Sequence, residues 1–75
     1  MRLDEVAYGA PVRVVGFPGM DAADEAVLAG LGMRPGVGVT KILRAPLRDP
    51  IECLVGSQLL AVEARLMREI AVEAP

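Results

Sequence analysis

The residues that could do chemistry in this 75-residue chain are few and scattered. The sequence holds no histidine, one cysteine (Cys53) and one serine (Ser57). Histidine is the commonest general base near neutral pH and the commonest transition-metal ligand, and without it the hydroxyl of Ser57 has no histidine to activate it. One cysteine cannot assemble a Cys/His metal set within the chain. These residue types predict a protein that is not an enzyme and that has no cofactor or metal site of its own.

Three acidic residues, Asp21, Asp24 and Glu25, are the remaining candidates for a chemical site. Their oxygens are the ligands that hard cations prefer. However, Asp21 stands where a helix would begin, and a carboxylate there accepts the free N–H groups of the first turn. The two acids that follow suit the positive end of the helix dipole. We therefore favour a capped, solvated helix start over a cation site.

The helix that follows these acids is predicted from its apolar spacing. Val27, Leu28 and Leu31 recur so that they form one apolar stripe. Gly32 ends the helix, because a residue just past a helix end often needs a positive φ, which glycine adopts at little cost. After it, Pro35-Gly36 suits the centre of a type II turn.

Short apolar runs predict five strands, over 11–17, 37–44, 51–55, 59–62 and 70–72. Around them, 3–9 reads as a lead-in with one turn that packs Leu3 and Val6, and 63–68 as a helical turn. Cys53 falls at an inward position, so we expect a small buried hydrophobe rather than a reactive thiol.

The second strand carries a break in its alternation. Val37 and Val39 share a face, whereas Ile42 has the opposite parity. A phase slip near Thr40-Lys41 would turn all three apolar residues inward, which is how a β-bulge is recognised in a sequence.

The order of elements predicts a mainly β fold in one domain, 1–75. We expect a small SH3-like barrel of five strands, with one α-helix inserted after the first strand and a short helical turn before the last. Closure into a barrel would remove the open edge that such apolar strands otherwise present.

Composition limits the partners. The formal net charge is −2, which gives no electrostatic footprint for nucleic acid. No apolar run approaches the length of a membrane span, and acids follow the first residues at once, so we expect a cytoplasmic protein without membrane insertion. Apolar residues make up 53% of the chain. This surplus fits either a tight core or apolar surface left for a partner or for self-association.

Two segments carry a family resemblance: 31–36 (Leu-Gly-Met-Arg-Pro-Gly) and 45–51 (Ala-Pro-Leu-Arg-Asp-Pro-Ile). Their order and spacing closely resemble FeoA, the small cytoplasmic accessory protein of bacterial ferrous iron uptake. The motif residues that match are Leu31, Gly32, Met33, Pro35, Gly36, Ala45, Pro46, Asp49, Pro50 and Ile51. We expect most of them to form turns rather than to touch a partner. The chain departs from the family at Glu63, where an arginine is common.

The resemblance implies the SH3-like fold and a non-catalytic role on the membrane permease FeoB, through its cytosolic GTPase region. Recruitment by that partner would bring the protein to the inner face of the membrane. Two alternatives remain open at this point: a stand-alone relative of the SH3-like regulatory domain of iron-dependent repressors, and a homo-oligomeric scaffold. The candidate interface residues are Met33 and Arg34 on the turn, Leu47 at the tip of the 45–51 loop, and Leu54 on the outward face of the third strand.

Overall fold

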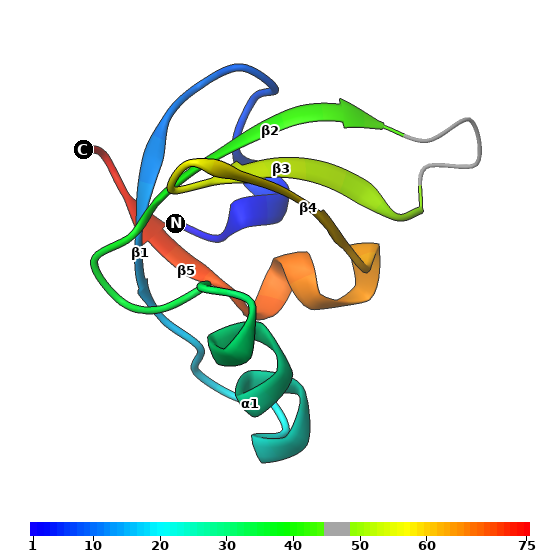
Figure 1. Ribbon diagram of the computed structural model, residues 1–75. Helices are drawn as coiled ribbons and strands as arrows, with labels where there is room; N and C mark the ends of the chain where they lie inside the picture. The colour runs from blue at the N-terminus through cyan, green and yellow to red at the C-terminus, as the bar shows by residue number, and fades with distance from the viewer. Residues whose placement is uncertain (45–48) are drawn as a thin grey trace.

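The computed structural model describes residues 1–44 and 49–75, and its secondary structure follows the predicted order (Figure 1). The elements are the 3₁₀ helix η1 (Leu3–Glu5), β1 (Val12–Gly16), α1 (Ala22–Gly30), β2 (Gly38–Arg44), β3 (Ile51–Val55), β4 (Gln58–Val62), the 3₁₀ helix η2 (Ala64–Glu69) and β5 (Ala71–Glu73). The mainly β class, the helix after the first strand and the helical turn before the last are confirmed.

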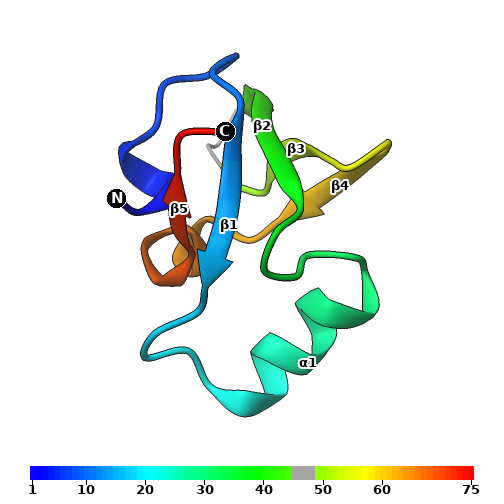
Figure 2. The same ribbon diagram turned by 90° about the vertical axis from the view of Figure 1, so that its left-hand side faces the viewer.

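The five strands form one antiparallel sheet in the order β4-β3-β2-β1-β5. Figure 2 shows β5 and β4 at opposite margins of this sheet. Among the described residues no pairing joins β4 to β5, so the closed barrel that the sequence predicted is not found. The reason lies in the connection between them: η2 leads the chain from β4 across to the far edge, where β5 pairs with β1.

The core lies between the inward face of the sheet and the helical segments. The largest fully buried side chains are Leu3, Leu28, Met33, Met67 and Ile70. They come from η1, α1, the turn after α1, η2 and the residue between η2 and β5, so every helical segment contributes to one cluster. Leu3 and Val6 pack as the lead-in predicted.

The start of α1 is capped as predicted, because the Asp21 carboxylate accepts a hydrogen bond from the Ala23 N–H at 2.8 Å. The apolar stripe is narrower than expected. Leu28 is buried, but Val27 and Leu31 are 62% and 43% exposed. Neighbouring residues of a helix point about 100° apart, so a side that buries Leu28 turns Val27 toward solvent.

The end of α1 is a Schellman motif, the hydrogen-bonded stop in which a positive-φ residue reverses the chain. Gly32 has φ +97°, and its N–H donates to the Ala29 carbonyl at 3.0 Å. The next N–H, that of Met33, donates to the Leu28 carbonyl at 2.9 Å. This bond folds Met33 back over the helix, so its side chain is fully buried and belongs to the same core cluster as Leu28. Met33 is therefore a core residue, and its assignment to an exposed interface was wrong.

The turn that follows also has its predicted form. Gly36 has φ +94°, and the Val37 N–H donates to the Arg34 carbonyl at 3.1 Å, as in a type II turn.

The predicted bulge in the second strand is present, but it lies later than expected. The register of β2 on β3 shifts between Lys41 and Leu43. The alternation of inward and outward side chains therefore continues up to Lys41, which is buried. Ile42 is 47% exposed, so the prediction that it points inward was wrong. The burial of Lys41 is tolerable because its ammonium lies 4.9 Å from the centroid of the Tyr8 ring, a cation–π contact.

Candidate interaction surface

The four residues expected at an interface do not come together. Met33 is in the core, and Leu47 lies outside the described residues. Arg34 is exposed, with its Nε donating to the Ala29 carbonyl at 3.0 Å at the end of α1. Leu54 is 37% exposed and alternates with the buried Cys53 and Val55, so it points to the opposite face of β3 from the core.

Leu54 belongs to a row of outward residues that crosses three strands. Thr40 on β2 pairs with Leu54 on β3, which pairs with Leu59 on β4. Leu59 is 63% exposed. Two neighbouring positions on β2, Ile42 and Leu43, are also exposed. We call Ile42, Leu43, Leu54 and Leu59 the outer apolar face.

Sequence reasoning identified only Leu54 of this face. Leu59 could have been found from the hairpin, because a two-residue turn at Gly56-Ser57 fixes the β3–β4 register and sets Leu59 opposite Leu54. Ile42 could not, because the position of the bulge decides its direction.

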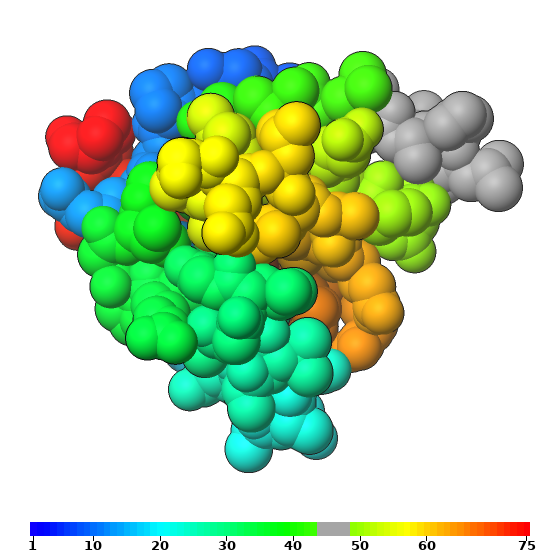
Figure 3. All heavy atoms as spheres, in the orientation of Figure 1, coloured from blue at the N-terminus to red at the C-terminus, as the bar shows by residue number. Residues whose placement is uncertain are grey.

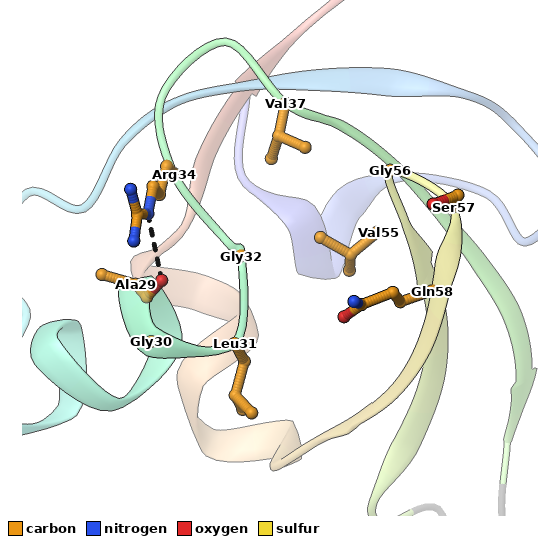
Figure 4. A pocket seen from close by; sticks show the side chains of 10 residues that line it. All are labelled: Ala29, Gly30, Leu31, Gly32, Arg34, Val37, Val55, Gly56, Ser57 and Gln58. Atoms are coloured by element: carbon orange, nitrogen blue, oxygen red, sulfur yellow. Dashed lines mark hydrogen bonds between the residues drawn. The ribbon is translucent and has the colours of Figure 1, made fainter.

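A groove lies on the inner side of the same hairpin, between the end of α1 and the start of β4. It encloses about 340 Å³ and is bordered by Leu31, Arg34, Val37, Val55 and Gln58, among others. Figure 4 shows Gln58 reaching into the hollow from β4, with Leu31 on the opposite side. Figure 3 shows α1 and the β3–β4 hairpin on the same face of the molecule.

A charge network ties α1 to the segment after β4. The terminal nitrogens of Arg65 bond the two oxygens of Asp24 at 3.0 and 3.1 Å, and its Nε donates to Glu63 at 2.6 Å. The hydrogen bond from Arg65 holds the pKa of Asp24 below its usual value, and the same two carboxylates raise the pKa of Arg65. Asp24 is thus engaged by a cation of the chain itself. Glu63 forms a second ion pair with the neighbouring Arg65.

The second motif also serves local structure. Asp49 accepts a hydrogen bond from the Ala64 N–H at 2.9 Å and so fixes the start of η2. Pro50 is exposed and Ile51 is a buried residue at the start of β3. Ala45 and Pro46 lie outside the described residues.

Cys53 is fully buried, as expected for a small hydrophobe. Burial raises the pKa of its thiol to about 11, against an opposing effect of the Lys41 charge. Within 1–44 and 49–75, no three His, Cys, Asp or Glu side chains gather as metal ligands. The same ranges contain no helix long and apolar enough to cross a membrane.

These features describe a small domain built on one antiparallel sheet. Its surface carries the outer apolar face and a groove at the start of an edge strand, and its helix ends in a Schellman motif at Gly32. The chain belongs to the FeoA domain family, whose sequence model matches residues 1–74.

Solved structures agree with this assignment. The iron(II) transport protein A of Clostridium thermocellum is 31% identical with a TM-score of 0.83, and the match covers 99% of this chain and 45% of that one. The FeoA protein of Chlorobium tepidum is 28% identical with a TM-score of 0.89, covering 99% and 70%. This chain thus spans less than half the length of the first relative.

A third structure shares the fold at lower identity. FeoA of Stenotrophomonas maltophilia is 22% identical with a TM-score of 0.79, over 97% of this chain and 89% of that one, and is described as an SH3 domain protein complexed with zinc. No curated protein matches the sequence.

Proposed function

We propose that this chain is a non-catalytic accessory protein of bacterial ferrous iron uptake that binds the cytosolic GTPase region of the FeoB permease. Membership of the FeoA family supports the link to ferrous iron transport. The Stenotrophomonas maltophilia structure is described as a candidate ferrous iron transport activating factor. In this proposal the protein works in the cytoplasm and is brought to the inner face of the membrane by its partner.

The observation that carries the proposal is the outer apolar face. Leu54 and Leu59 stand side by side on neighbouring strands, and both are substantially exposed. Burying a leucine side chain fully is worth about 1.5–3 kcal/mol, so two adjacent leucines can anchor an interface. The small net charge of −2 adds little long-range attraction, so we expect binding that changes little with salt.

Docking of this kind would act on FeoB by changing the balance between its states. A bound protein shifts a conformational equilibrium only by the difference in its affinity for the two states. The proposal therefore requires that this chain bind the GTPase region more tightly in one nucleotide state than in another.

The test is a titration of this protein against the soluble cytosolic region of FeoB, with and without guanine nucleotide. We expect Leu54→Asp and Leu59→Asp to weaken binding at least about tenfold, because each places a charge in an apolar contact. Val15→Asp is the matched control, since Val15 is an exposed apolar residue (51%) on β1, two strands away from β3. Absence of binding in every nucleotide state would contradict the proposal.

A further inference from the structure

β4 has one edge that pairs with no other strand of the described chain. Its only partner in the sheet is β3. The two-residue turn Gly56-Ser57 joins Val55 to Gln58, so these two residues form a hydrogen-bonded pair. In an antiparallel ladder, hydrogen-bonded and non-hydrogen-bonded pairs alternate, so Leu59 and Ala61 stand in non-hydrogen-bonded pairs. The N–H and C=O groups of Leu59 and Ala61 therefore point away from β3. Over residues 1–44 and 49–75, no backbone hydrogen bond links β4 to anything outside the strand ladder.

This edge lacks the features that usually prevent another strand from adding. Proteins protect an open edge with charged residues, proline, a bulge or a covering segment. β4 reads Gln-Leu-Leu-Ala-Val, with no charge and no proline, and its register on β3 runs without a shift. The outward N–H and C=O groups of Leu59 and Ala61 therefore have the spacing with which another β-strand can pair.

The groove adjoins the start of this edge at Gln58, the one residue of β4 that borders it. On its far side is the end of α1 with Leu31, and on its inner wall are Val37 and Val55 (Figure 4). One strand laid beside β4 would run past Ala61 and Leu59 and would reach this groove at Gln58. The volume of the groove, about 340 Å³, is at the lower end of the range for ligand pockets, which suits a few side chains of a segment.

The groove also has a charge at one end. The Nε of Arg34 is bonded to the Ala29 carbonyl, and this bond leaves the two terminal nitrogens of the guanidinium without a hydrogen bond or an ion pair in the described structure. A held guanidinium with free donors is suited to a carboxylate. The opposite end of β4 leads to Glu63. There, the two carboxylates of Glu63 and Asp24 pair with the single cation Arg65, so this end carries an excess of negative charge.

We propose that the open edge of β4 binds an extended segment of the partner, which adds to β4 as a further strand and reaches the groove at Gln58. The segment carries an apolar residue beside exposed Leu59 and an acidic residue at the end that meets Arg34. This inference rests on the proposed function, because it assigns the partner's mode of attachment. Main-chain hydrogen bonds to Leu59 and Ala61 supply affinity, and the exposed Leu59 side chain and Arg34 supply selectivity.

The first measurement is amide hydrogen exchange of this protein alone and with the soluble cytosolic region of FeoB. We expect the exchange of the Leu59 and Ala61 amides to slow at least about tenfold on binding, as expected for newly formed main-chain hydrogen bonds. The Leu60 amide is an internal control, because it is already bonded to β3. An interface made by side chains on the outer apolar face alone would leave both outward amides unbonded.

The second measurement uses Ala61→Pro, which removes one outward N–H and leaves the ladder to β3 intact. We expect binding to weaken at least about tenfold, whereas Val15→Asp, on β1 and away from this edge, should bind like the unmodified protein. Arg34→Gln should weaken binding several-fold, because it removes the charge that meets the acidic residue of the segment. If Ala61→Pro fails to fold, the exchange measurement on the unmodified protein still decides the question.

The outcomes separate the two proposals. Binding of the unmodified protein with unprotected Leu59 and Ala61 amides and an unaffected Ala61→Pro variant would overturn strand addition and keep the proposed function. No binding by the unmodified protein would overturn both. A concentration-dependent dimer that Ala61→Pro dissolves would show that a second copy occupies the edge, and would overturn the assignment to a partner segment.

Discussion

The two edges of the sheet are used in opposite ways. At β5, the segment before η1 covers the edge: the Val72 N–H donates to the Met1 carbonyl at 2.8 Å, and Arg2 forms a bridge with Ala71. Fully buried Leu3 follows directly. At β4, the outward main-chain groups of the strand bond to nothing in the described residues, and Leu59 remains 63% exposed.

The difference indicates a division of labour. Covering an edge adds hydrogen bonds and buried apolar area, so the β5 side should contribute to stability. An open edge contributes little to stability but keeps main-chain groups available for a second chain. Substitutions at the two edges should therefore separate stability from binding.

The largest effect on stability is expected at the closed edge. Leu3→Ala should lower the free energy of unfolding by about 2–5 kcal/mol, because it leaves a cavity in the core. Leu59→Ala at the open edge is the control and should change it by less than about 0.5 kcal/mol. Urea unfolding measures both. Equal losses in the two variants would show that the edges do not differ in this way.

Within β4 itself, adjacent prolines should behave differently. Leu60→Pro removes an N–H that bonds to β3 and should cost about 3 kcal/mol. Ala61→Pro removes an outward N–H and should cost less than about 1 kcal/mol. Thermal unfolding of the two variants gives the comparison. Similar destabilisation by both would mean that the outward N–H of Ala61 is already in use.

The turn that borders the open groove provides the next test. Gly36→Val should destabilise the protein by about 1–3 kcal/mol, because a β-branched residue is strained at φ +94°. The control is Gly30→Ala, where φ is not positive and an added Cβ meets nothing within 4 Å. That variant should be neutral or slightly stabilising. An unchanged melting temperature in Gly36→Val would contradict the strain expected at Gly36 in the type II turn.

The last test concerns Cys53 on β3, the strand that pairs with β4. The unfolded chain loses the thiol proton near pH 9.0, whereas the folded protein keeps it to about pH 11. The raised pKa therefore makes its full contribution to the free energy of unfolding below pH 9.0, and this contribution is lost as the pH rises toward 11. Urea midpoints on either side of this range should fall more for the unmodified protein than for Cys53→Ala. Parallel curves would contradict the raised pKa.

Local features of the fold were predictable, because the signals that set them are short. Asp21 caps the helix, and Gly32 and Gly36 have positive φ, each from the conformational preference of one residue type. The failures are non-local. Barrel closure depends on where η2 delivers the chain, and the direction of Ile42 depends on a bulge that pairing with β3 decides.

The site was harder to predict than the fold. Leu54 was found by alternation, but Met33 was misplaced because the Schellman hydrogen bonds fold it back over the helix. The groove brings Leu31 and Arg34 beside Val55 and Gln58 from a different part of the chain. No pattern within one segment could show that juxtaposition.

The strand order also has a kinetic consequence. β2, β3 and β4 follow one another along the chain and pair as neighbours, whereas Arg13 on β1 meets Glu73 on β5 across 60 positions. The entropy of loop closure makes distant pairings slower to form. We expect β2, β3 and β4 to assemble first and β5 to dock last. The open edge of β4 would then form before β5 covers the edge of β1. The rate at which β5 pairs with β1 therefore decides how long a folding chain exposes two edges through which it can associate with other chains.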